Sequence, residues 1–106
     1  MEEITVEELK KKNDQGDSYL LLDVREPFEA NISTIGGQLI PLDQLPGQME
    51  KLPAEKDKEI IVLCRSGGRS AKAQKLLLDN GYSNVKNLKG GINQWARTID
   101  KSLPEY

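Results

Sequence analysis

The sequence predicts an α/β domain built on a mainly parallel sheet with helices on both faces, and three observations lead to this fold class. The runs "YLLLDV" at 19–24 and "KEIIVLC" at 58–64 are continuous apolar segments, typical of strands covered on both faces. A helical pattern follows the second run, and strands that alternate with helices favour parallel pairing through right-handed crossovers. A chain of 106 residues suffices for one core and not for two, so we expect a single domain over residues 1–106.

The first half of the chain adds a helix, a short strand and a second helix. Thr5 is followed three residues later by Glu8, a capping-box pattern that predicts a helix from Thr5 to near Gly16. A strand is expected at 38–40, ended by the proline that follows it, because proline cannot donate a ladder hydrogen bond. A polar helix is then expected at 45–52.

The second half predicts a helix, a strand and a last helix. The helix after the second apolar run has apolar residues at helical spacing and ends near Gly81. Residues 83–90 predict the next strand, and two glycines then allow a tight turn into a helix over 91–100. Trp95 lies on the apolar side of that helix, so we expect it in the core rather than stacked on a ligand.

Composition excludes several classes of function. The 15 Lys and Arg residues against 17 Asp and Glu give a net charge of −2, which does not favour nucleic acid or a membrane surface as a partner. No segment resembles a signal peptide or a membrane span, and the single cysteine fits a reducing compartment, so we expect a cytoplasmic protein. Without histidine, and with one cysteine, we expect no metal and no cofactor.

The single cysteine, Cys64, lies where a strand hands over to a helix. Parallel strands end at a common edge, where ligands of such sheets collect, so Asp23 and Arg25 after the first apolar run are expected on the same rim as Cys64. Adjacent glycines let a loop turn its N–H groups inward, and the helix dipole points to the same place. Four residues separate Cys64 from Arg69: Arg65, Ser66, Gly67 and Gly68.

Such surroundings favour a thiolate at Cys64 without help from histidine, because N–H groups, a helix N-terminus and a guanidinium all lower a thiol pKa. The alternative is that Cys64 is only a small apolar packing residue at the end of a strand. Such a residue does not require two glycines and two arginines after it. A phosphate-binding loop of the Walker type is excluded because the Gly-Lys-Ser/Thr ending is missing. Attack on phosphorus and acceptance of sulfur remain open.

The segments "LLDVREPFE" and "CRSGGRSAKAQKLLLDNGYSNVKNLKGGINQW" resemble a single-domain rhodanese, a thiosulfate or persulfide sulfurtransferase. The resemblance runs from Ile4 to Trp95 and implies a five-stranded sheet. Rhodaneses have six residues from the loop cysteine to the loop arginine, as here from Cys64 to Arg69. Related phosphatases have one residue more, which disfavours a phosphatase.

The resemblance implies a role for each loop residue. Cys64 would attack the outer sulfur of a donor and hold it as a persulfide, whose terminal sulfur the N–H groups of residues 65–69 would stabilise. Arg69 would lock the loop against the sheet, and Asp23 and Arg25 would brace it from the neighbouring strand end. Arg65 and Ser66 would help to select donor and acceptor at the mouth.

Two departures from the common pattern carry information. Ser33 or a neighbour stands where most rhodaneses have a structural histidine. The segments "IGGQLIPLDQLP" and "WARTIDKSLPEY" are most similar to the rhodanese domains of adenylyltransferases that activate sulfur carriers, which implies a sulfur-carrier protein or a cysteine desulfurase as a partner beside the small donor and acceptor. A monomer is expected, and a non-catalytic or redox-sensing binding module is the alternative function.

Overall fold

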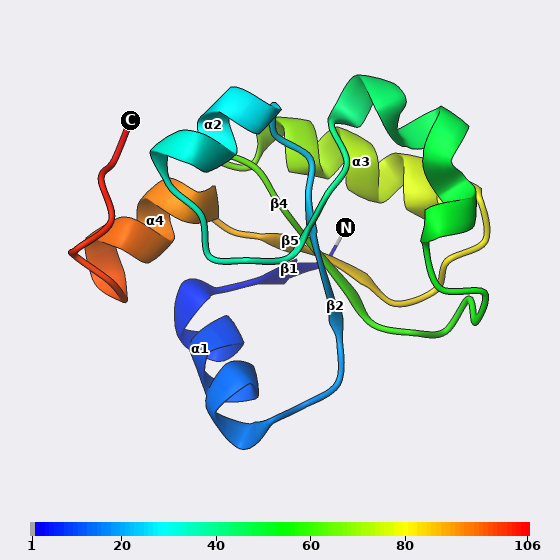
Figure 1. The fold of residues 1–106 in the computed structure, drawn as a ribbon. Coiled ribbons are helices and arrows are strands. Elements are labelled where there is room, and N and C mark those ends of the chain that lie inside the picture. Colours follow the sequence, from blue (N-terminus) through cyan, green and yellow to red (C-terminus); the bar gives the residue numbers. More distant parts are fainter. Residues whose placement is uncertain (1) are drawn as a thin grey trace.

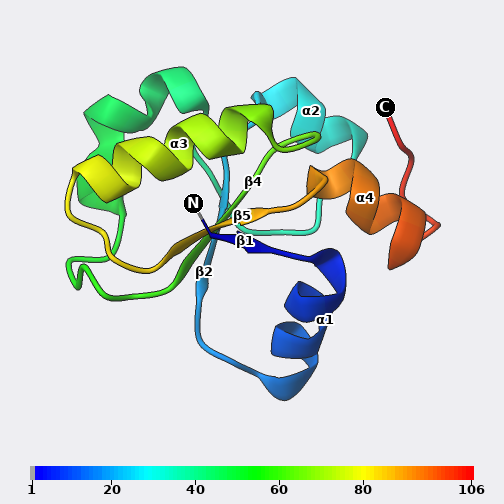
Figure 2. The ribbon, with the colours of Figure 1, turned by 180° about the vertical axis from the view of Figure 1, so that it is seen from behind.

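The computed structural model describes residues 2–106, which form one five-stranded sheet between two layers of helices (Figures 1 and 2). The strands lie in the order β1-β5-β4-β2-β3, and every pairing is parallel. The elements are β1 (Glu3–Ile4), α1 (Val6–Gln15), β2 (Leu20–Asp23), α2 (Pro27–Ile32), β3 (Gln38–Leu39), the 3₁₀ segment η1 (Leu42–Lys51), β4 (Ile60–Leu63), α3 (Gly68–Asp79), β5 (Val85–Leu88) and α4 (Gly91–Thr98).

The expected fold class is confirmed, with one refinement to the sheet. Pairing is parallel throughout rather than mainly parallel. The fifth strand is β1, which the strand patterns did not predict because two residues are too few to show a period. It pairs with β5, where Glu3 lies opposite Asn87 and Ile4 opposite Leu88.

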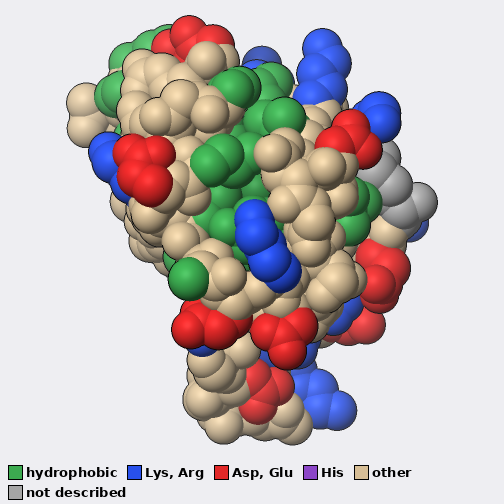
Figure 3. Space-filling view, turned by 90° about the vertical axis from the view of Figure 1, so that its right-hand side faces the viewer, with side chains coloured by type: hydrophobic (Ala, Val, Ile, Leu, Met, Phe, Trp, Pro, Cys, Tyr) green, Lys and Arg blue, Asp and Glu red, His purple; other side chains and the backbone are tan. Residues whose placement is uncertain are grey.

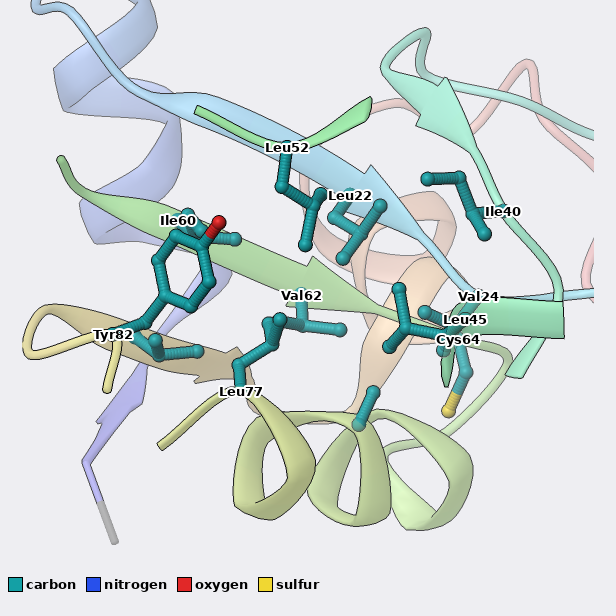
Figure 4. Packing of buried hydrophobic residues seen from close by; sticks show 12 residues of the cluster. Leu22, Val24, Ile40, Leu45, Leu52, Ile60, Val62, Cys64, Leu77 and Tyr82 are labelled. Carbon is teal, nitrogen blue, oxygen red and sulfur yellow. The ribbon is translucent and has the colours of Figure 1, made fainter. Parts of the chain in front are cut away.

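Alternate residues of the central strand β4 face the two helical layers, which is why its sequence is apolar without interruption. Ile60 and Val62 pack with residues of α3 and η1, and Cys64, just after the strand, continues that face (Figure 4). Ile61 and Leu63 pack on the other face, where α1 and α4 supply the cover. The side chain of Cys64 therefore lies on the face of the sheet that α3 covers.

The predicted helix ends are largely confirmed. Thr5 Oγ1 accepts the N–H of Glu8 at 3.1 Å and the Glu8 side chain accepts the N–H of Thr5 at 3.0 Å, so the capping box begins α1. Gly16 ends α1 in a left-handed conformation. The helix expected at 45–52 is instead a 3₁₀ segment that begins earlier, at Leu42, and includes Pro46, which cannot donate a helical hydrogen bond.

The surface carries mixed charges around limited apolar areas. On the face shown in Figure 3, hydrophobic side chains form a central band that basic and acidic side chains surround. Among residues 2–106, no helix has the length and apolar character needed to cross a membrane. Trp95 is 7% exposed and packs in the core with Ile92, as the sequence predicted.

Candidate active site

Cys64 lies at the carboxyl end of β4, the middle strand of the sheet, and its side chain points towards the start of α3 (Figure 4). The residue is 1% exposed. Its Sγ accepts the N–H of Gly67 at 3.1 Å and lies 3.4 Å from the Oγ of Ser70. The segment that follows Cys64 in sequence thus supplies an N–H donor to the sulfur and places a hydroxyl beside it.

Burial and the polar groups beside the sulfur have opposite effects on the pKa of the thiol. Burial raises the pKa of Cys64, because a buried thiolate is poorly solvated. The hydroxyl of Ser70 and the N–H groups of Ser70, Gly67 and Ser66 favour the thiolate and together outweigh burial, so the pKa lies below its ordinary value. Of the N–H groups expected in the cradle, those of Ser66 and Gly67 interact with the sulfur, and these groups are neutral.

One of the two loop glycines explains the turn. Gly67 has φ +120° and caps α3, which begins at Gly68, slightly earlier than expected. Gly68 is itself the first helical residue and has no positive φ, so the expectation that both glycines turn the chain is wrong for Gly68. A single left-handed residue is sufficient to direct the N–H of Gly67 at the sulfur.

The first turn of α4 holds the backbone carbonyls of Cys64 and Arg65. Ile92 donates its N–H to the oxygen of Cys64 at 3.0 Å, and Asn93 donates to the oxygen of Arg65 at 3.2 Å. Gly91 makes this approach feasible: a Cβ there would lie 2.5 Å from the Cys64 oxygen and 2.4 Å from the Arg65 oxygen. Because both carbonyls face α4, the N–H groups of the loop are free to face the sulfur.

A polar network from β5 supports the inner side of the loop. Ser70 Oγ lies 2.5 Å from Asn87 Oδ1 and 3.1 Å from the oxygen of Gly67. The amide of Asn87 donates to that same oxygen at 3.1 Å. Ser70 is fully buried and Asn87 is 6% exposed, so these contacts are protected from water.

The resemblance implied that Arg69 would lock the loop against the sheet, but Arg69 bonds to a helix instead. Its two terminal nitrogens donate to the carboxylate of Glu29 on α2, at 2.6 and 2.8 Å. The Arg69 guanidinium holds the pKa of Glu29 at about 2, well below its ordinary value, against the opposing effect of burial. The loop is therefore fastened to α2, because the carboxylate that faces the arginine belongs to that helix.

Asp23 and Arg25 lie near the loop but do not contact it directly within residues 2–106. Arg25 is fully buried, and its guanidinium donates to Asp23 at 2.8 Å and to the carbonyl oxygens of Glu29 and Ser33 at 3.3 and 2.9 Å. Burial opposes its charge, but Asp23 and the hydroxyl of Tyr106 keep the pKa of Arg25 above its ordinary value. The pair thus braces α2 and the segment after it, and it is linked to the loop through Glu29 and through Tyr106.

Arg65 and Ser66, expected at the mouth, are both exposed. The guanidinium carbon of Arg65 lies 5.1 Å from the centre of the Tyr106 ring. The hydroxyl of Tyr106 bonds to Arg25 and Glu29, so this residue does more than fill space. Within residues 2–106 no group of three or more His, Cys, Asp and Glu side chains could hold a metal ion.

The sequence model of the rhodanese-like domain matches residues 5–98 of the chain. The chain belongs to the rhodanese-like family. Among solved structures, a rhodanese-related protein from Thermoplasma volcanium has a TM-score of 0.80 at 33% identity, covering 98% of this chain and 96% of that chain. The resemblance and the fold that it implied are confirmed.

Two kinds of curated relative match this rhodanese-like chain. A sulfurtransferase of Allochromatium vinosum is 38% identical over 96 residues, covering 90% of this chain and 88% of that protein. The adenylyltransferase and sulfurtransferase MOCS3-2 of Zea mays is 36% identical over 109 residues and 97% of this chain. The rhodanese-like chain spans 23% of the length of that maize protein and of its relative MOCS3-1, so the predicted likeness to adenylyltransferase domains is confirmed for the domain alone.

Sequence reasoning missed four residues of the rhodanese-like site: Glu29, Ser70, Asn87 and Tyr106. Ser70 directly follows Arg69, and a hydroxyl in the first turn of a helix after a cysteine loop could have been recognised as a donor to the thiol. Asn87, a polar residue near the end of a buried strand, was a second signal. The roles of Glu29 and Tyr106 had no local signal, because their partners lie far away in the sequence.

Proposed function

We propose that this rhodanese-like protein is a sulfurtransferase that carries sulfane sulfur on Cys64. The observation that carries the proposal is the environment of the thiol: its pKa is lowered by a hydroxyl and three N–H groups that surround the sulfur. A lower pKa increases the fraction of the thiol that is present as thiolate, which is the nucleophilic form. The Allochromatium vinosum sulfurtransferase, matched over 88% of its length, supports the same reaction class.

In the first half of the reaction, the Cys64 thiolate attacks the outer sulfur of thiosulfate. A bond forms between the two sulfurs, the S–S bond of thiosulfate breaks, and its electron pair leaves with sulfite. The product is a Cys64 persulfide anion, and the charge of −3 is the same before and after the step. A persulfide donor R–S–SH would react in the same way, with the thiolate R–S⁻ as the leaving group.

In the second half, a thiophilic acceptor takes the sulfur. Cyanide attacks the terminal sulfur, the bond to Cys64 breaks, and thiocyanate leaves the thiolate ready for another cycle. The N–H groups of Ser66, Gly67 and Ser70 would stabilise the terminal sulfur anion, as such groups stabilise an oxyanion. Gly68 and Arg69 begin the helix whose positive end faces the same place.

The residues around the loop have supporting roles in this proposal. Arg65 and Ser66 lie exposed at the mouth and would contact donor and acceptor. Arg69 fixes the loop to α2, and the Asp23–Arg25 pair fixes α2 in turn. A cofactor has no step in this scheme, because the cysteine sulfur supplies the nucleophile and the donor supplies the electrophilic sulfur.

A protein partner is also part of the proposal. The maize relative is named an adenylyltransferase and sulfurtransferase, which favours a sulfur-carrier protein as acceptor or a cysteine desulfurase as donor. We place the reaction in a reducing compartment such as the cytoplasm, where one unpaired cysteine stays reduced.

Intact mass spectrometry tests the proposal directly. We expect the protein to gain one sulfur atom on treatment with thiosulfate or glutathione persulfide, and to lose it on addition of cyanide. Cys64→Ala should gain none and serves as the matched control. If the wild-type protein gains no sulfur from either donor or from a persulfidated cysteine desulfurase, the sulfurtransferase proposal is wrong.

A second candidate, a binding module with a redox-sensing thiol, is favoured by the 1% exposure of Cys64. Because the thiol is so well buried, the size of the molecules that can reach it is limited. This function predicts oxidation of Cys64 by hydrogen peroxide without sulfur uptake from any donor. The same mass measurement separates the two candidates.

A further inference from the structure

Tyr106 bonds a buried cation and a carboxylate at once. Its hydroxyl accepts a hydrogen bond from Nη1 of Arg25 at 2.9 Å and donates one to Oε1 of Glu29 at 2.9 Å. The same Oε1 accepts Nη2 of Arg69 at 2.8 Å. The phenol therefore joins the Asp23–Arg25 pair to the ion pair that fastens the loop.

The backbone of Tyr106 is fixed by Asn93 on α4. The side-chain amide of Asn93 donates to the backbone oxygen of Tyr106 at 2.8 Å, and the backbone N–H of Tyr106 donates to Asn93 Oδ1 at 3.2 Å. The N–H of Asn93 donates to the carbonyl oxygen of Arg65 at 3.2 Å. One asparagine thus aligns the tyrosine with the second residue of the active loop.

The ring of Tyr106 faces the guanidinium of Arg65. The 5.1 Å between the guanidinium carbon and the ring centre lies within the range of a cation–π contact. The other three arginines, Arg25, Arg69 and Arg97, each pair with a carboxylate. Within residues 2–106, Arg65 has no carboxylate partner, so its charge at the mouth is not neutralised.

We propose that Tyr106 is a positioning residue that holds the Arg65 guanidinium at the mouth of the loop, where it selects sulfur donors with greater negative charge. This inference rests on the proposed function and names its substrate class. An exposed arginine side chain samples many rotamers, and a fixed aromatic face reduces that freedom. Coulomb attraction is proportional to the charge of the ligand, so a fixed guanidinium favours a dianion over a monoanion.

Binding to the Cys64→Ala protein tests the inference without turnover. Dissociation constants are measured by amide chemical shifts for thiosulfate, a dianion, and methanethiosulfonate, a monoanion. We expect Tyr106→Leu to weaken thiosulfate binding about tenfold and methanethiosulfonate binding about threefold, because the second ligand carries half the charge. Tyr106→Phe keeps the ring and should restore both affinities, although it should lower the melting temperature because the buried Arg25 loses a partner.

A double variant separates positioning from general damage. Arg65→Gln should reproduce the loss of Tyr106→Leu, and the two changes together should lose no more than Arg65→Gln alone. If Tyr106→Leu does not fold, Asn93→Ser takes its place, since it releases the tyrosine and keeps the N–H that holds Arg65. Equal weakening of both ligands, additive losses, or no thiosulfate binding to the Cys64→Ala protein would each overturn the inference.

The experiments distinguish failure of this inference from failure of the proposed function. If wild-type protein takes up no sulfur while the charge preference depends on Tyr106, the mouth is an anion site and the sulfurtransferase proposal alone fails. If sulfur is taken up and Tyr106→Leu leaves the ratio of the two dissociation constants unchanged, this inference alone fails.

Discussion

The two sides of the Cys64–Arg69 loop are built from different chemistry. The inner side, formed by Cys64, Ser70 and Asn87, is buried and contains neutral hydrogen-bonding groups around the sulfur. The outer side is partly exposed and ionic, and it is formed by Arg65, Arg69, Glu29 and Tyr106. The loop sequence places two arginines near Cys64. In the structure, Arg69 bonds to the carboxylate of Glu29, and Arg65 lies against the ring of Tyr106.

The difference teaches how a buried thiol can be activated. Neutral donors that converge on Cys64 favour the thiolate without burying a guanidinium against it, and burying an unpaired charge is expensive. The charges remain at the mouth, where Arg69 is 36% exposed and water reduces that cost. We therefore expect the inner side to control the reactivity of the sulfur, and the outer side to control the position of the loop and the electrostatic potential around it.

Gly91→Ala should disturb both sides and have the largest effect. The new Cβ would lie 2.4 Å from the Arg65 oxygen, and the residue has φ +61°. We expect about 3 kcal/mol of lost stability and sulfur transfer reduced more than about 100-fold, because overpacking and a left-handed alanine both cost free energy. Denaturant unfolding and thiocyanate formation measure the two effects.

Gly36→Ala is the matched control for Gly91. Gly36 has φ +88°, and nothing lies within 4 Å of the added Cβ. It should lose only about 1 to 2 kcal/mol, the cost of the left-handed conformation. Equal losses in stability and transfer at both positions would contradict the role given to the close contact with the loop.

Glu29→Gln tests the outer side through pH. The folded-state pKa of about 2 lies below the ordinary value of 4.5, so the carboxylate stabilises the wild-type protein above pH 4.5 and that contribution disappears as pH falls towards 2. Removal of the charge should cost about 1 to 3 kcal/mol at pH 7, allowing for the exposure of Arg69, and should flatten the stability profile between pH 4.5 and 2.

The ion pair between Lys75 and Asp79, in the last turns of α3, provides the comparison. Its side chains are 70% and 60% exposed, so Lys75→Met should change stability by less than about 0.5 kcal/mol. If the stability of Glu29→Gln fell between pH 4.5 and 2 as much as that of the wild-type protein, another carboxylate would be responsible for the pH dependence.

Ser70→Ala tests the inner side through the reactivity of the thiol. The loss of the hydroxyl should raise the pKa of Cys64, because the thiolate loses a donor. We expect the rate of alkylation by iodoacetamide at neutral pH to fall about tenfold and its pH midpoint to rise. Ser83→Ala, which removes an exposed hydroxyl far from the loop, should leave both unchanged, and an unchanged midpoint in Ser70→Ala would contradict the role of the hydroxyl.

Much of the fold was predictable because its signals are local. The uninterrupted apolar run of β4 results from burial on both faces, and the capping box at Thr5 is formed by groups three residues apart. The two-residue strand β1 was not predictable, because only its pairing with β5 defines it as a strand. The 3₁₀ geometry of η1 was missed although Pro46 was visible, since its apolar spacing also suits an α-helix.

The position of Cys64 and its loop at a strand end could be predicted from the sequence, and most side-chain contacts around the loop could not. Cys64, the N–H groups after it and the turn at Gly67 follow from consecutive residues, and their arrangement agrees with the structure. The partner of Arg69 was misplaced, because a long charged side chain bonds to whichever opposite charge the packing brings within reach. Here that charge is Glu29, which lies 40 positions away in sequence.

The amino-acid sequence by itself determined the parallel α/β architecture, the position of the cysteine at a strand end and the N–H cradle around it, because periodicity and short-range geometry specify these features. Only the tertiary structure decided what surrounds the cradle: the β5 amide behind Ser70, the α2 carboxylate that holds Arg69, and the tyrosine that faces Arg65. These contacts join segments from different helices and strands, and hydrophobic packing of the two sheet faces sets the distances between them.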